Sequence, residues 1–203
     1  MPLTRKQRQN LQNKEEILAI AADLFAQKGF QAVTMREIAK QAEFSIGTLY
    51  NLFKNKDDLI TELLREPVRK IQREFIKILD SDRDETRKIA DFILCHNRLS
   101  IEYRQGFKLY FSSLHSEYAR QISIVQEIEK MRADIRAKLT SVFRTGIQKG
   151  MFRKLRPEIM TMALRASLLE LNTMMFEDRD EDELFQYAMQ FKDIFLNGVL
   201  QPE

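Results

Sequence analysis

Residues 34–59, TMREIAKQAEFSIGTLYNLFKNKDDL, contain the start signals of three short helices. Thr34 with Glu37 three residues later is typical of a capping box, in which each side chain satisfies a backbone N–H of the other. Ser45 and Asn55 precede two further apolar segments, and both residue types favour the position just before a helix. Only a few residues separate the first two helices, so a tight turn must join them, as in a helix-turn-helix.

The flanking residues extend this pattern into a compact N-terminal domain at 15–65. Apolar residues recur at helical spacing from Glu15 to Phe30, and Gly29 provides a helix stop. A further helix runs from Asn55 toward Pro67, where proline predicts a kink or a break. Small residues, which allow close helix packing, lie where the two central helices meet: Ala39, Ala42 and Gly47.

Composition indicates that the whole chain is helical. Of 203 residues, 44% are apolar and 31% charged, while Gly and Pro number 6 and 4, which leaves little turn chemistry for a sheet protein. Beyond Pro67 the amphipathic stripes are longer, and the last two, at about 157–176 and 183–199, are rich in Met, Leu and Phe. The sequence therefore predicts an all-α protein with a helix-turn-helix head and a helical C-terminal domain at 66–203.

Positive charge is concentrated at the N-terminus. The net charge is only +3, yet residues 1–14 hold four basic side chains and no acidic one. Such a basic arm favours contact with phosphate groups, although a solvated chain start would look the same.

Several classes of protein are disfavoured. The single Cys suits a reducing compartment, no apolar run approaches the roughly 18 residues that span a bilayer, and no apolar signal region is seen, so we expect a cytoplasmic protein. Asp80, Asp82 and Asp84 imitate a calcium loop, but its required Gly and Glu positions hold Glu85 and Asp91. We expect no catalytic residue, no metal and no cofactor, and hence no enzyme.

The segments Thr34–Ala39, Ser45–Tyr50 and Phe53–Leu59 resemble the TetR family of bacterial transcriptional regulators over about residues 12–60. One departure is that Glu43-Phe44 stand where the family has Gly-Val. The resemblance implies that a helix from about Ser45 to Leu52 enters the major groove of DNA with its N-terminal residues on base edges.

The resemblance and the chemistry of the side chains together indicate nine DNA-contacting residues. Ser45 and Thr48 can bond a phosphate or a base, Asn51 can read adenine, and Gly47 leaves room for the DNA backbone. Arg36 is a candidate guanine reader or phosphate clamp. The predicted set is Thr34, Arg36, Ser45, Ile46, Gly47, Thr48, Tyr50, Asn51 and Lys56. The alternative is that Thr34 and Ser45 act only as helix caps, that Tyr50 lies in the core and that Arg36 is solvated.

The central helices carry a concentration of aromatic side chains. In the resembled family this region forms a ligand cavity, and ligand binding releases DNA. The candidate lining is Phe92, Cys95, His96, Tyr103, Phe107 and Phe111. A cavity of this kind suits a lipophilic or aromatic effector, whereas plain core packing is the alternative for each residue.

The last two helices resemble the family's dimer interface. One short recognition helix binds weakly, and two copies about 34 Å apart read a palindrome together. The sequence therefore predicts a ligand-responsive regulator, most simply a repressor, that binds a palindromic DNA operator as a homodimer. The alternatives are a helical scaffold that binds only protein and a small helical enzyme that acts on a lipophilic substrate.

Overall fold

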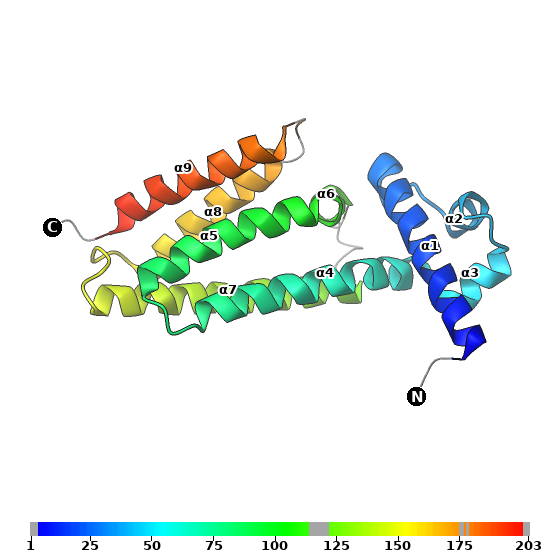
Figure 1. Ribbon diagram of the computed structural model, residues 1–203, viewed down its shortest axis with the longest axis horizontal. Coiled ribbons are helices and arrows are strands. Elements are labelled where there is room, and N and C mark those ends of the chain that lie inside the picture. The colour runs from blue at the N-terminus through cyan, green and yellow to red at the C-terminus, as the bar shows by residue number, and fades with distance from the viewer. Residues whose placement is uncertain (1–3, 114–121, 175–176, 178, 201–203) are drawn as a thin grey trace. The chain divides into compact units, whose positions relative to one another are not determined.

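The computed structural model describes residues 4–113, 122–174, 177 and 179–200, and it is all-α as expected (Figure 1). The helices are α1 (Arg5–Lys28), α2 (Met35–Gln41), α3 (Ile46–Leu52), α4 (Lys56–Leu79), α5 (Glu85–Glu102), α6 (Arg104–Ser113), α7 (Ser123–Gln148), α8 (Pro157–Met174) and α9 (Glu181–Val199). None of these helices is long and apolar enough to cross a membrane.

Contacts between backbone segments divide the chain into two units. The first comprises residues 1–67 and 105–128, and the second comprises 68–104 and 129–203. Residues 105–128 are thus grouped with the head, whereas the sequence assigned them to the C-terminal domain. Helix α4 contributes its beginning to the first unit and its end to the second.

The core of the head is built by α1, α2 and α3, which all contact one another. Ile17, Phe25 and Leu49 are buried there, and the Phe25 ring packs on Phe30 with centroids 5.2 Å apart. Asn55 caps α4 as predicted, since its Oδ1 accepts the backbone N–H of Asp58 at 2.7 Å.

Two expectations about helix ends are wrong. The helix expected to begin near Glu15 begins at Arg5, because Thr4 and Gln7 form a complete capping box ahead of it. The basic residues at 5–14 are therefore helical. The break expected before Pro67 is absent: α4 runs through it, and buried Leu64 and Val68 on its two sides support the continuation. The alternative expectation, a kink at Pro67, stays a prediction.

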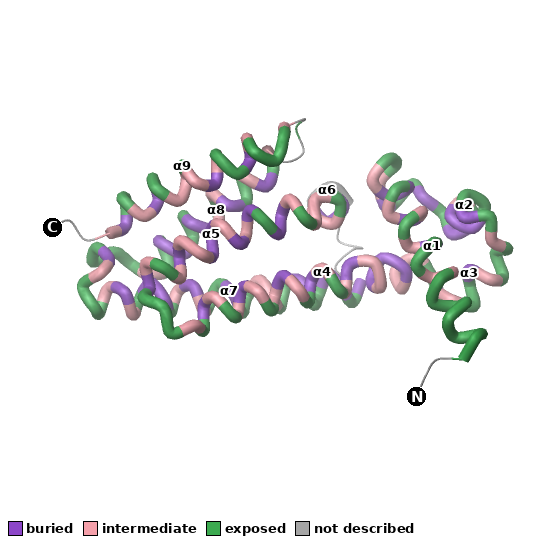
Figure 2. The backbone as a smooth tube through the Cα atoms, in the orientation of Figure 1, coloured by how far each residue is buried: buried purple, intermediate pink, exposed green. Residues whose placement is uncertain are grey.

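The second unit is held together by α5, α8 and α9, which pack side by side (Figure 1). The end of α7 packs tightly, because a Cβ on Gly146 would lie 2.2 Å from the Phe152 ring. Glu85, which is buried, accepts both of its hydrogen bonds from Lys149, at 3.0 and 3.1 Å. Buried and exposed residues alternate along the helices of this unit (Figure 2).

Candidate nucleic-acid interface

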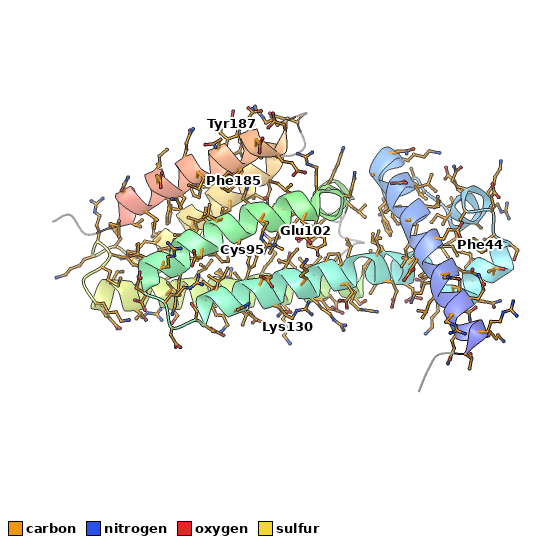
Figure 3. The ribbon with its side chains drawn as sticks, in the orientation of Figure 1. Phe44, Cys95, Glu102, Lys130, Phe185 and Tyr187 are labelled. Atoms are coloured by element: carbon orange, nitrogen blue, oxygen red, sulfur yellow. The ribbon has the colours of Figure 1, made fainter. Side chains whose placement is uncertain are left out.

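The turn between α2 and α3 is a helix C-terminal motif with an unusual residue in its left-handed position. The N–H of Phe44 donates to the carbonyl of Ala39 at 2.9 Å, and that of Glu43 donates to the carbonyl of Lys40 at 3.3 Å. This pattern is a Schellman motif, whose left-handed residue is usually Gly. Here Glu43 holds the position with φ 57°, so the turn forms at the cost of backbone strain. Phe44, labelled in Figure 3, follows it and is partly buried.

The N-terminus of α3 is capped as the sequence predicts. Ser45 Oγ accepts the N–H of Thr48 at 3.0 Å, and the two hydroxyls lie 2.8 Å apart. Leu49, fully buried, anchors the helix on the head. Because these groups fix both the start and the inner face of α3, the direction of its outer face is fixed too.

The outer face of α3 is exposed to solvent, including two large apolar side chains. Ile46 is 41% exposed and Tyr50, one turn later, is 52% exposed. Gly47 and Asn51, on the same short helix, are also exposed. A Cβ at Gly47 would make only one ordinary contact, 3.8 Å from Ser45 Oγ, so the fold itself has room for a side chain there. The structure therefore brings the predicted α3 residues together on one accessible surface.

Helix α2 contributes Thr34 and Arg36, both exposed. The Thr34 hydroxyl accepts the N–H of Glu37 at 3.2 Å. The second half of the predicted capping box is wrong, however, because the Glu37 carboxylate pairs with Lys28 at 2.5 Å instead of returning to Thr34. The hydrogen bond from Lys28 is the largest cause of a lowered Glu37 pKa. Arg36 remains exposed at the start of α2.

Lys56 has contacts that the sequence did not predict. Its ammonium group donates to the backbone carbonyls of Phe30 at 2.6 Å and Val33 at 2.8 Å, and more weakly to Gln31 at 3.3 Å. It also lies 4.5 Å from the centroid of the Phe30 ring. Burial lowers the Lys56 pKa. Lys56 thus ties the segment after α1 to the start of α4, and its predicted contact with phosphate must compete with these carbonyls.

Basic side chains at the start of α1 add positive charge to the head. Arg5, Lys6 and Arg8 are exposed. Lys14 forms a 2.8 Å ion pair with Glu62, and this hydrogen bond is the main cause of a lowered Glu62 pKa. Three of the four N-terminal cations are therefore exposed to an anionic partner, while Lys14 is already paired.

The predicted ligand-pocket residues are not all brought together. Phe92 and His96 pack with Phe75 in the core of the second unit, with ring centroids 4.6 Å (Phe75–Phe92) and 5.9 Å (Phe75–His96) apart. Burial lowers the His96 pKa to about 4. Tyr103 is partly buried beneath Lys70, and Phe107 belongs to the first unit. The side chain of Phe111 lies outside the described residues.

Cys95 instead lines an open groove of about 750 Å³ in the second unit. Figure 3 labels Cys95 and Glu102 on α5 and Phe185 on α9, which face it from two helices. Its apolar lining consists of Ile78, Leu94, Ile101 and Phe185. Its acidic lining consists of Glu74, Asp91, Glu102, Glu181 and Asp182.

Most of the groove's acidic groups already have cationic partners. Arg98 pairs with Glu74 at 3.5 Å and with Glu102 at 3.4 Å, and Arg87 pairs with Asp91 at 3.3 Å. The groove thus combines an apolar floor with a largely balanced charged rim. No local sequence signal could have found it, since its residues come from positions 74 to 185 and meet only through tertiary packing.

The N-terminal part of the chain is similar to known bacterial regulators. Residues 17–63 match the family described as "Bacterial regulatory proteins, tetR family". The chain is 26% identical over 143 residues to the HTH-type transcriptional repressor KstR2 of Mycolicibacterium smegmatis, which covers 69% of this chain and 67% of that protein. It is 25% identical over 186 residues to the HTH-type transcriptional regulator QacR of Staphylococcus aureus, covering 92% and 97%.

Solved structures share the fold. The structure of the ketosteroid transcriptional regulator KstR2 of Mycobacterium tuberculosis superposes with a TM-score of 0.79 at 22% identity, over 93% of this chain and 95% of that one. The TetR-family regulator PfmR of Thermus thermophilus gives a TM-score of 0.72 at 22% identity, over 96% and 97%. The likeness therefore extends beyond the helix-turn-helix to the helical body.

Proposed function

We infer that this chain belongs to the tetR family of bacterial regulatory proteins and is a ligand-responsive transcriptional repressor. It acts in the cytoplasm and binds a palindromic operator as a homodimer. The observation that carries the proposal is the outer face of α3. This helix is capped and anchored on one side, yet it presents exposed Ile46 and Tyr50 beside exposed Gly47 and Asn51 on the other. A rigid helix with an accessible polar and apolar face suits the major groove.

Dimer formation is supported by the surface of the second unit. Three exposed apolar side chains recur at helical spacing on α8, namely Ile159 (52% exposed), Met162 (59%) and Leu169 (42%), and α9 adds Ile194 (72%). We call the three residues on α8 the apolar patch. Exposed apolar patches of this kind mark interaction sites, and a second copy of the chain supplies a complementary surface.

Effector response requires a ligand site and a movable connection. The groove beside Cys95, with its apolar floor, is the candidate site for a lipophilic or aromatic effector. Pro67, where α4 passes from one unit to the other, lacks a backbone donor and is the candidate hinge. In one conformation the two α3 helices of the dimer match the spacing of successive major grooves, and in the other they do not. An effector that binds the second conformation more tightly lowers operator affinity by the difference in its binding free energy for the two, typically about 1–3 kcal/mol.

The DNA-binding proposal is tested by selecting genomic fragments with the purified protein and measuring affinity at several salt concentrations. Tyr50→Ala should weaken operator binding by about tenfold or more and leave the melting temperature unchanged. Leu11→Ala is the matched control, because Leu11 is also an exposed apolar residue of the head (47%) but lies on α1. Equal loss in both variants, or no sequence-selective binding by the wild type, would overturn the proposal and favour a protein-binding scaffold.

Gly47→Ala separates DNA binding from folding. Because the fold has room for the added methyl group, the variant should be more stable by about 0.5–1 kcal/mol through its helix propensity. It should nevertheless bind the operator more weakly, since the methyl group stands where the DNA approaches. Unchanged operator affinity would show that α3 does not approach DNA at this point.

The effector site is tested by a bulky substitution in the groove. Ile101→Trp should abolish release of DNA by a lipophilic effector while leaving operator affinity intact. Met189→Trp, outside the groove lining, is the control. Chemical turnover of the bound compound would instead support the enzyme alternative.

A further inference from the structure

Helices α7 and α8 meet along a seam whose contacts are complementary at one end. Arg144 on α7 pairs with Glu158 on α8 at 3.4 Å. One turn further along, the hydroxyls of Thr140 and Thr161 lie 3.0 Å apart. The positions move down α7 as they move up α8, so the two helices run antiparallel, and their register is set by these two pairs.

One helical turn beyond the Thr140–Thr161 pair, the same register places two cations opposite each other. Arg136 follows Thr140 by one turn on α7, and Arg165 follows Thr161 by one turn on α8. Arg132 lies a further turn along the same side of α7. The stretch of α7 concerned is near Lys130, which is labelled in Figure 3. We call Arg132, Arg136 and Arg165 the arginine triad.

Among the residues that the structure describes, two of the three arginines of the triad have no ion-pair partner. Glu129 pairs with Arg132 at 3.2 Å. Within the described part of the chain, neither Arg136 nor Arg165 forms an ion pair or a side-chain hydrogen bond. Burial lowers the pKa of the Arg165 guanidinium, and the charges of Arg132 and Arg136 lower it further, while Glu129 raises it. Because Arg132 is paired, the excess charge is that of Arg136 and Arg165, about +2.

We propose that the arginine triad binds a phosphate dianion at the α7–α8 seam. Guanidinium groups present fixed pairs of N–H donors that match the oxygens of a phosphate. Donors from two helices can approach one anion from different sides, and a charge of −2 neutralises the local excess, whereas a single carboxylate would leave half of it. The bound group is either free phosphate or the phosphate of a larger organic molecule. The site is independent of the DNA-binding surface and does not rest on the proposed function.

The proposal is tested by titrating inorganic phosphate into the full chain by calorimetry and by thermal unfolding, with chloride at equal ionic strength as reference. Phosphate should raise the melting temperature of the wild type beyond the chloride reference, because a ligand that binds only the folded state stabilises it. Arg136→Gln and Arg165→Gln should each weaken phosphate binding by about tenfold or more. Arg144→Gln is the matched control: it removes the same charge from the same seam, at a residue that already has a partner.

The outcomes are decisive in both directions. Absence of a phosphate effect in the wild type, or equal weakening by Arg144→Gln, overturns the site. Loss of dimer in Arg165→Gln without a change in phosphate affinity also overturns it, because the triad would then pair with carboxylates of a second copy. Phenyl phosphate distinguishes the two sources: tighter binding than inorganic phosphate indicates a phosphorylated organic ligand, and equal binding indicates the free ion.

Discussion

The head and the second unit both expose large apolar side chains, but in different surroundings. On α3, Ile46 and Tyr50 stand among hydroxyl, amide and glycine positions on a helix of seven residues. On α8, Ile159, Met162 and Leu169 form a stripe on a helix of eighteen. A mixed surface on a short rigid helix suits a polar partner with methyl groups, such as DNA, whereas a long apolar stripe suits another apolar protein surface.

The difference shows how one chain can keep two kinds of partner separate. The α3 surface obtains its precision from caps and from a buried anchor, so its effects should be local. The apolar patch would stabilise a dimer through the area of apolar surface that it buries, so a single charge there should weaken the dimer strongly. Four substitutions test this contrast.

Met162→Glu should have the largest effect. A carboxylate in the centre of the apolar patch would lose its hydration in a dimer, and Arg165, one turn away, would offset only part of that cost. We therefore expect monomers in sedimentation experiments and operator affinity lower by roughly 100-fold or more. Ala137→Glu, which adds the same charge at an exposed position on α7, should leave both unchanged. A dimeric Met162→Glu variant would contradict the assignment of the patch.

Lys56→Ala should destabilise the head by roughly 2–3 kcal/mol, because two backbone carbonyls lose a charged donor. Urea unfolding measures this loss, with exposed Lys54→Ala as the control. If Lys56 also contacts a phosphate, the slope of operator affinity against salt should fall by about one unit. Unchanged stability would show that the carbonyl contacts carry no net energy.

The lowered pKa of His96 should make the stability of the second unit depend on pH. Its folded-state pKa of about 4 lies below the unfolded value of 6.5, so the unfolded state binds the proton first as the pH falls. Stability from this residue is complete above about pH 6.5 and declines toward pH 4, by roughly 1–3 kcal/mol. His96→Phe keeps a ring against Phe75 and should flatten this part of the unfolding profile relative to wild type; an identical profile would refute the assignment.

Glu43→Gly should have the smallest effect and should raise stability by about 1 kcal/mol, since Gly adopts the left-handed conformation without strain. Glu43→Gln removes only the charge and should not stabilise the turn. Comparison of operator affinity in the two variants separates backbone strain from repulsion of phosphate. Equal stability of the two variants would contradict strain at this residue.

Much of the head could be predicted because its signals are local. Ser45 and Asn55 cap their helices as expected, and the bounds of α3 agree with the expected helix within one residue. The early start of α1 was missed because residues 5–14 lack apolar periodicity, although Thr4 and Gln7 are a visible capping-box signal. The contacts of Lys56 could not be predicted, since its carbonyl partners are 23 to 26 residues away.

The helices of the second unit follow from periodicity, but its sites do not. The aromatic side chains predicted to line a cavity include Phe92 and His96, and both pack against Phe75. Periodicity shows that a face is buried and cannot show what it is buried against. The groove and the arginine triad depend on which helices become neighbours, and no local pattern encodes that.

The helical start of α1 has a kinetic consequence. A flexible cationic tail captures DNA from a distance and then folds onto it. Arg5 and Arg8 instead belong to a rigid helix, which fixes the spacing between them. Such a helix loses little conformational entropy when it docks on DNA, but it does not sample distant positions before contact. Substituting Thr4 by Ala would fray the first turn of α1 and make these cations more mobile. The variant should therefore associate with DNA faster than the wild type and also release it faster.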